Sequence, residues 1–191
     1  MQLDGYTVYQ LREYSREKVI TSLFTDPENP DDFIAGYVRV AGDRQCLVES
    51  VSPYGWFDGW YAVRNSCVNE VAYDALYAQR LELLLKMNRA VNCILPEPAA
   101  DDDIILHTLT WAQEHSRVVT VWTHTEAFTG FVEQADDLYV TIGVLDFLGK
   151  NPMPARLSLR NIELMSVGAE EERMFEQLAS ADIPFEEPDR E

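Results

Sequence analysis

The tetrapeptide Ala35-Gly36-Tyr37-Val38 returns as Thr129-Gly130-Phe131-Val132, 94 positions further along the chain. The same displacement carries three other residues onto similar ones: Asp43 onto Asp137, Val68 onto Ile162, and Val71 onto Met165. Matches at one fixed displacement are the signature of an internal repeat. The sequence therefore predicts one structural unit that occurs twice.

Upstream of these matches the displacement is larger. The segment from Ser15 resembles the segment from Ser116, and Val19 then matches Val118 at a displacement of 99. The difference of five residues is assigned to a longer loop in the first copy, at 25–32. The sequence thus predicts that the first copy differs from the second by an insertion in this loop.

Each copy has the pattern of a helix, five short strands and a closing helix. In the second copy an apolar stripe at helical spacing runs from Ile104 to Ala112 behind the acidic cap Asp101–Asp103. Alternating apolar residues after it are typical of half-buried strands. First-copy strands are expected at 19–24, 33–40, 46–51, 60–63 and 68–71, with Asp58-Gly59 as a hairpin turn. The closing helices are expected at 73–90 and 170–180.

The copies are separated by a segment with Pro96, Pro98 and three consecutive aspartates. Prolines and small residues interrupt helices, so this segment is expected to be a linker. The predicted organisation is a first repeat at 1–92, a linker at 93–103, and a second repeat at 104–191 with an acidic tail. The helix at 73–90 is expected to pack between or across the two units through Leu76, Leu84 and Met87.

Short motifs in both copies point to one known fold. In the second copy they are Thr129-Gly130-Phe131-Val132, Asp136-Asp137 and Arg160-Asn161-Ile162-Glu163-Leu164-Met165; in the first, Ala35-Gly36-Tyr37-Val38, Asp43 and Arg64-Asn65. Together with a helix leading into five strands, they resemble the Sm-like fold, especially its bacterial Hfq-like branch. The resemblance covers about residues 104–167 and about residues 6–73. It implies an α+β chain, mainly β, with two tandem five-stranded barrels of Sm-like or SH3-like form.

The resemblance also implies a binding rim. Members of that fold typically form rings and bind single-stranded RNA with the loop after strand two and the loop before strand five. The corresponding residues are Asp43, Arg44, Arg64 and Asn65 in the first copy, and Asp136, Asp137, Arg160 and Asn161 in the second. The Tyr-Lys-His sequence that Hfq-like proteins carry before strand five is absent here.

Composition limits the partners of the chain. Lys and Arg total 15 against 33 Asp and Glu, which gives a net charge of −18. Such a charge repels a phosphate backbone, so RNA binding is disfavoured. Cys46, Cys67 and Cys93 match no disulfide framework, and no segment has the length of a membrane helix or the pattern of a leader peptide. We therefore expect a cytoplasmic protein without membrane contact.

Catalytic and metal-binding patterns are missing from the sequence. The three histidines, His107, His115 and His124, show no repeated ligand spacing. There is no Gly-x-Ser-x-Gly motif, and Gly55 and Gly59 lack the Lys-Ser/Thr ending of a phosphate-binding loop. Carboxylate pairs are spread along the chain, and no pattern marks a pocket around them. We expect no catalytic residue, no metal, no cofactor and no enzymatic activity.

The densest group of aromatic residues lies between Ser52 and Tyr61. It consists of Tyr54, Trp56, Phe57, Trp60 and Tyr61. In one interpretation alternate rings fill the core and the others cover a helix; in another they form a protein interface. Base stacking ranks third, because only Arg44 and Arg64 are near enough to supply positive charge. We expect the segment to be partly exposed and to mediate self-association or partner binding.

These observations favour a non-catalytic interaction or scaffold protein built from tandem Sm-like units. The alternative is a regulator that binds single-stranded RNA through the loop rims. A small enzyme with an atypical site is the third hypothesis. A local basic rim would favour the RNA hypothesis, whereas an uncharged aromatic patch would favour the scaffold.

Overall fold

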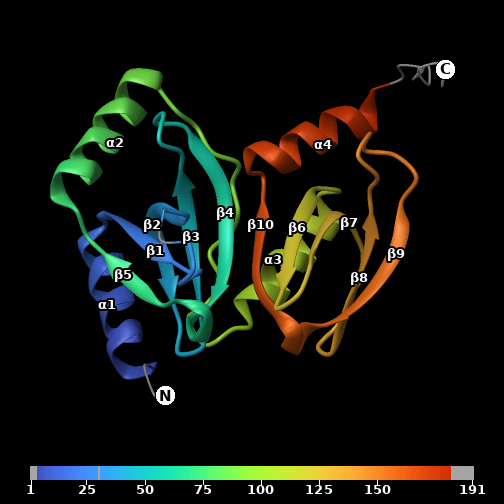
Figure 1. The fold of residues 1–191 in the computed structure, drawn as a ribbon, viewed down its shortest axis with the longest axis horizontal. Coiled ribbons are helices and arrows are strands. Elements are labelled where there is room, and N and C mark those ends of the chain that lie inside the picture. Colours follow the sequence, from blue (N-terminus) through green and yellow to red (C-terminus); the bar gives the residue numbers. More distant parts are fainter. Residues whose placement is uncertain (1–3, 30, 182–191) are drawn as a thin grey trace.

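The computed structural model describes residues 4–29 and 31–181 and shows two halves side by side (Figure 1). The first half contains α1 (Asp4–Glu17), β1 (Ile20–Phe24), β2 (Phe33–Ala41), β3 (Gln45–Val51), β4 (Phe57–Arg64), a 3₁₀ turn (Asn65–Cys67), β5 (Glu70–Ala72) and α2 (Ala75–Asn88). The second contains α3 (Ile104–Glu114), β6 (Val118–Thr123), β7 (Ala127–Ala135), β8 (Tyr139–Val144), β9 (Met153–Ser158), a 3₁₀ turn (Leu159–Asn161), β10 (Ile162–Val167) and α4 (Glu170–Ser180). The same order of elements therefore occurs twice. The predicted acidic tail lies outside the described residues.

The ten strands of the described residues belong to one open antiparallel sheet, in the order β5-β1-β2-β3-β4-β10-β6-β7-β8-β9. The expected α+β class, with helices and antiparallel strands, is observed, but the prediction of closed barrels is wrong. The outer edge of β4 does not pair with another strand of the first copy. It pairs with β10 of the other copy, from Val63 opposite Leu164 to Trp60 opposite Val167. Residue periodicity shows which side chains share a face, but it does not show which strand an edge will pair with.

The two copies match in detail within this sheet. Register irregularities occur between Val38 and Val40 in β2 and between Val132 and Gln134 in β7. A Cβ on Gly36 would lie 2.3 Å from the Glu49 carbonyl oxygen, and one on Gly130 would meet the neighbouring strand just as closely. Both glycines are therefore required where the backbone of the second strand lies unusually close to that of the paired third strand.

The displacement that relates β1 to its counterpart β6 differs by one residue from the expected value of 99. Ile20 starts β1 and Val118 starts β6, and they are 98 positions apart rather than 99. Pairing fixes this register, because Ile20 lies opposite Tyr37 and Val118 opposite Phe131. The run of valines in the second copy fits two alignments equally well by sequence alone.

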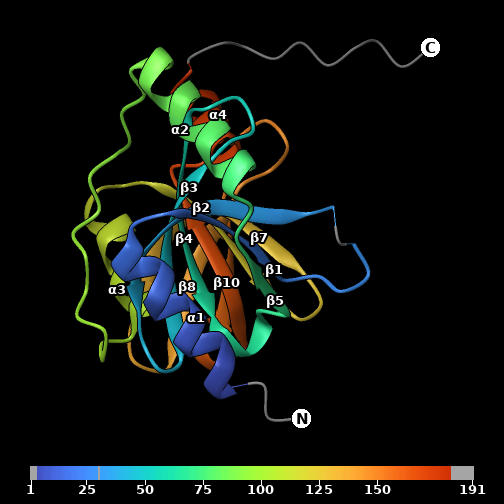
Figure 2. The ribbon, with the colours of Figure 1, turned by 90° about the vertical axis from the view of Figure 1, so that its left-hand side faces the viewer.

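Helix α3, rather than α2, connects the halves. It contacts β7, β6 and β10 of its own copy and also β3 and β4 of the first copy. The expectation that α2 packs between or across the two units is wrong, since α2 covers β1 of the first copy through Ala78, Leu81 and Leu85. Leu76 and Met87 are 79% and 69% exposed. In Figures 1 and 2, α2 and α4 lie at the same end of the molecule.

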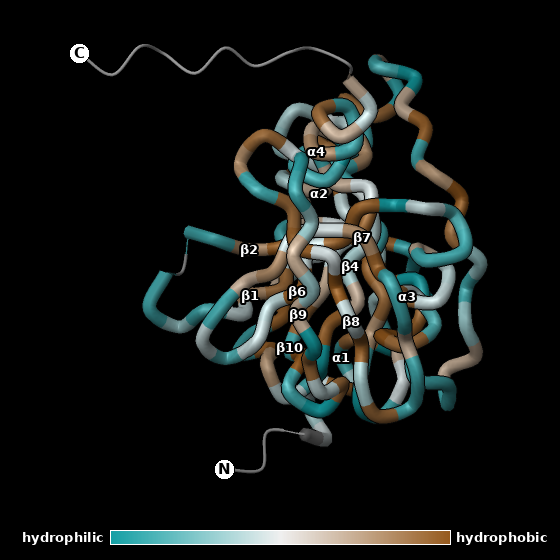
Figure 3. Tube along the Cα trace, turned by 90° about the vertical axis from the view of Figure 1, so that its right-hand side faces the viewer, coloured by the Kyte–Doolittle hydropathy of each residue, from teal (hydrophilic) through white to brown (hydrophobic). Residues whose placement is uncertain are grey.

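The largest core cluster crosses the boundary between the copies. It joins residues of α3, β6 and β10 to Val40, Leu47, Trp60 and Ala62 of the first copy. Figure 3 shows hydrophobic segments concentrated in the strands, whereas the tube that leads into β2 is hydrophilic. Burial of this shared apolar surface favours the association of the two halves.

The outer edge of the sheet carries a different surface. The positions in β7, β8 and β9 equivalent to Val40, Leu47 and Ala62 are Gln134, Thr141 and Arg156. Arg156 lies over the ring of Tyr139 at 4.3 Å. Polar and charged residues, with Pro154 on the same strand, are typical of edges that resist further pairing.

Candidate interaction groove

Two side chains of the first copy satisfy backbone groups at helix ends in the second, and a third donates to carbonyl oxygens at the 3₁₀ turn that precedes β10. Gln45 Oε1 accepts the Ile105 N–H at 3.0 Å, at the start of α3. Asp58 accepts the Glu170 N–H at 2.8 Å, at the start of α4. Arg64 donates to the carbonyl oxygens of Leu159, at 2.7 Å, and of Ile162. Because helix ends leave backbone groups without partners, these contacts fix the orientation of the two copies.

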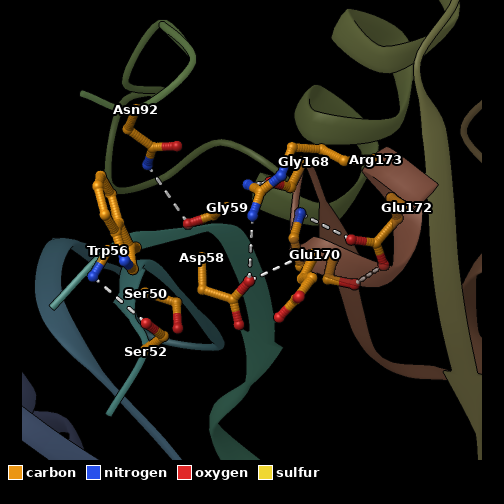
Figure 4. A network of polar contacts seen from close by, with 12 residues as sticks. Ser50, Ser52, Trp56, Asp58, Gly59, Asn92, Gly168, Glu170, Glu172 and Arg173 are labelled. Carbon is orange, nitrogen blue, oxygen red and sulfur yellow. Dashed lines mark hydrogen bonds and ion pairs between the residues drawn. The ribbon is translucent and has the colours of Figure 1, made fainter. Parts of the chain in front are cut away.

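Asp58 takes the place of a missing cap. The N-cap residue of α4 is Ala169, whose side chain makes no capping hydrogen bond. The Asp58 carboxylate instead accepts the N–H of the first helical residue, Glu170, from the other copy, and it lies 3.8 Å from an Arg173 guanidinium nitrogen. Figure 4 shows the Asp58 side chain extending from β4 toward Glu170 at the start of α4.

Gly59 makes this approach possible. Its φ is +72°, and a Cβ there would lie 2.4 Å from the backbone nitrogen of Ala169. Asp58-Gly59 therefore does not form the expected hairpin turn; both residues lie inside β4, and the turn falls at 53–55. Position 59 does require a glycine, but the requirement arises from the close contact with Ala169 of the other copy and not from a hairpin turn.

Beneath this corner lies a buried carboxyl group. Glu172 is 1% exposed, accepts the Ala169 N–H at 2.8 Å and accepts the hydroxyl of Ser166. Burial raises the pKa of Glu172, while these hydrogen bonds lower it by a smaller amount. Its oxygens are thus engaged in holding α4 to β10.

A groove runs along the junction above these contacts. It consists of two adjoining cavities of about 1040 and 580 Å³ that share Ser52, Asp58, Tyr61 and Trp122. The larger cavity continues over the turn at 52–58 and the first turns of α4, and the smaller continues toward the start of β2. We call the two together the junction groove; neither copy alone provides all of its walls.

The structure divides the predicted aromatic residues between the core and the groove. Trp60 is 5% exposed and donates its ring N–H to the Cys93 carbonyl at 2.9 Å. Tyr54 and Trp56 are 77% and 51% exposed, and they line the larger cavity with Phe57 and Tyr61. Alternation along β4 sends neighbouring rings to opposite faces of the sheet.

Trp122 completes the aromatic wall, and sequence reasoning missed it. It lies in β6 and faces the groove with Tyr61 of β4 because β10 is inserted between these strands. No spacing in the sequence indicates this insertion. At the displacement of 98 that strand pairing fixes, Trp122 corresponds to Phe24, an aromatic match that the displacement of 99 conceals.

Acidic residues surround the groove. Its walls include Asp26, Asp31, Asp32, Asp58, Glu170 and Glu171, and the only basic residue among the described lining residues is Arg173. Burial, followed by the charges of Asp58, Glu172, Glu171 and Asp32, raises the pKa of the Tyr61 hydroxyl. The groove therefore combines aromatic walls with a strongly negative potential.

The predicted rim residues do not gather in one place. Arg64, Arg160 and Asn161 line a separate cavity of about 570 Å³ together with Arg156. Asp43 pairs with Arg12 at 2.6 Å, and the carbonyl of Arg44 accepts the Asn65 N–H at 2.9 Å. Asp136 accepts the N–H groups of Leu138 and Tyr139 at 2.8 Å, which lowers its pKa. Asp137 is exposed beside it.

The cysteines are not activated nucleophiles. All three are free thiols, and burial raises the pKa of Cys46 to about 12 and also raises the pKa values of Cys67 and Cys93. Within residues 4–29 and 31–181, no group of three or more His, Cys, Asp or Glu could hold a metal ion. No helix in that part of the chain is long and apolar enough to cross a membrane.

Comparisons with protein-family models, curated proteins and solved structures give no match.

Proposed function

We propose that this chain is a non-catalytic interaction protein of the cytoplasm and that its binding surface is the junction groove. The observation that carries the proposal is the exposure of Trp56 and Tyr54 on the wall of a groove of about 1040 Å³. Large aromatic side chains are enriched at interfaces and are the commonest anchors of binding energy. Tyr54 and Trp56 stay exposed although α2 contacts the same turn through Asn88.

The groove is also held in shape before any partner arrives. Asn88 of α2 donates to the carbonyl oxygens of Tyr54 and Gly55, both at 2.9 Å. Ser52 Oγ accepts the Trp56 N–H at 3.3 Å, and Asp58 fixes the opposite wall to α4. A preformed surface loses less conformational entropy on binding, which favours affinity.

The proposed relationship of each copy to the Sm-like fold gains support from the repeated order of helix and five strands. It gains further support from the glycine requirement at Gly36 and Gly130. A scaffold of this kind would present one composite surface at the junction of its two units.

Binding of single-stranded RNA is the second candidate. The observation that favours it is the cavity in which Arg64, Arg156 and Arg160 gather in an otherwise acidic chain. Arg64, however, donates to backbone carbonyls, and Glu126 and Glu163 line the same cavity. Retention of an oligo-A or oligo-U probe at about 150 mM salt, lost on Arg160→Ala, would favour this candidate over the first.

Capture from a lysate of the source organism tests the first proposal. The bait is the full chain, the groove variant is Trp56→Ala, and the control is Phe147→Ala, which removes an 89% exposed ring that does not line the groove. A protein retained by the wild type and the control but lost by the groove variant supports the proposal. Equal retention by all three contradicts it.

A further inference from the structure

Four of the acidic residues that line the junction groove form two pairs of sequence neighbours. Asp31 and Asp32 lie at the end next to β2, and Glu170 and Glu171 lie at the end next to α4. Tyr61 and Trp122, which line both cavities, are shared by the two parts of the groove. The charges of Asp32 and Glu171 both act on the Tyr61 hydroxyl, so the two pairs flank one aromatic surface.

These four carboxylates take no part in the hydrogen bonds and ion pairs that stabilise the fold. Among the described residues, none of their side chains makes a hydrogen bond or an ion pair, in contrast to Asp58 and Glu172. Glu170 and Glu171 are favoured at a helix N-terminus in any protein. Asp31 and Asp32 have no such helix, and like charges around one groove repel each other. The two pairs are therefore available to form ion pairs with a cationic occupant.

We propose that the occupant of the junction groove is a basic segment of a partner protein, with Arg or Lys side chains that stack on Tyr61, Trp122 and Trp56 and pair with the two acidic pairs. This inference rests on the proposed function and names its partner class. The charge of the groove complements a basic segment, and its aromatic walls suit the same side chains.

The chemistry of these side chains matches both features. A guanidinium or ammonium group over an aromatic face is attracted by the ring quadrupole, most strongly by tryptophan. Arginine also presents a planar fork that binds a carboxylate through two hydrogen bonds. The same carboxylates repel phosphate groups, which excludes a nucleic acid from this groove.

Selection from a library of random peptides displayed on phage tests the inference, with the immobilised full chain as bait. We expect the enriched peptides to carry net positive charge and to include arginine. Enrichment of neutral or acidic peptides, or no enrichment, would overturn the inference. A synthetic copy of the most enriched peptide then serves as the probe for affinity measurements.

Two charge variants decide whether the groove itself binds that probe. The groove variant is Asp32→Asn with Glu170→Gln and Glu171→Gln. The control is Glu97→Gln with Glu114→Gln and Glu133→Gln, which changes the net charge equally at exposed residues outside the groove. We expect binding about tenfold or more weaker for the groove variant and nearly unchanged for the control. Equal weakening in both would show attraction to the whole surface and contradict the inference.

The capture experiment separates this inference from the proposed function. If Trp56→Ala loses the partner but the groove charge variant keeps it, the groove binds a protein and the basic-segment inference fails. If Trp56→Ala keeps the partner, both fail. Thermal melting of each variant confirms that a loss of binding is not a loss of fold.

Discussion

The carboxylate of Asp58 accepts a hydrogen bond from the backbone N–H of Glu170, 112 positions later in the chain, at 2.8 Å. This contact caps a helix of one copy with a residue of the other. It also sets the distance between the aromatic wall and α4, and so the width of the junction groove. A substitution of Asp58 should therefore affect both the free energy of unfolding and binding in the junction groove.

Replacing Asp58 by Ala should lower the free energy of unfolding by about 1 kcal/mol, the usual cost of removing an N-cap side chain. Asn keeps an oxygen that can accept the same N–H, so Asp58→Asn should stay close to the wild type. Urea denaturation of the two variants measures the difference. Equal loss in both would show that the charge, rather than the cap, stabilises α4.

Trp56 and Trp60 should behave oppositely. Trp56→Ala should lower the free energy of unfolding by only about 1–2 kcal/mol, because about half of the ring is exposed. It should weaken partner binding by roughly 2 kcal/mol or more. Trp60→Ala removes a buried ring and should cost about 3–5 kcal/mol of stability. Calorimetric melting and binding assays on both variants would contradict this assignment if Trp56→Ala lost the fold.

Trp56 and Trp60 illustrate which features of the fold and of the groove could be predicted from the sequence. The repeat, the strands and the partial exposure of the aromatic segment follow from local patterns, because alternation and turn residues act over a few positions. The pairing of β4 with β10 does not, since an unpaired strand edge looks the same whichever partner it takes. Trp122 and the caps by Gln45 and Asp58 depend on that pairing. The groove could therefore be predicted only in its first-copy half.

Glu172 gives the stability a pH dependence of definite sign. Its pKa is raised in the folded protein by burial, so the folded state binds more protons than the unfolded state above the ordinary value of 4.5. Stability should therefore fall as the pH rises through the interval between 4.5 and the raised value. In Glu172→Gln the amide oxygen can still accept the Ala169 N–H and the amide nitrogen can donate to the Ser166 hydroxyl oxygen, so this variant should remove the slope. Urea denaturation at several pH values would refute the assignment if the slope stayed in the variant.

The outer edge at β9 should resist pairing because of its polar residues. Replacing Gln134, Thr141 and Arg156 by Val, Leu and Ala would copy there the surface that Val40, Leu47 and Ala62 present at the junction. We expect this variant to self-associate at concentrations where the wild type does not, because an apolar sheet edge invites further pairing. Sedimentation velocity distinguishes the two. A variant that associates no more than the wild type would contradict the role given to these side chains.

The four tryptophans allow the most direct test of the groove as the binding surface. Trp56 and Trp122 line it, whereas Trp60 and Trp111 are buried outside it, at 5% and 8% exposure. Incorporation of 5-fluorotryptophan gives each ring a ¹⁹F resonance that a single Trp→Phe substitution assigns. On titration with the partner recovered by capture, the resonances of Trp56 and Trp122 should shift while those of Trp60 and Trp111 stay in place. Shifts confined to Trp60 or Trp111, or no shift at Trp56 on saturation, would contradict binding in the junction groove.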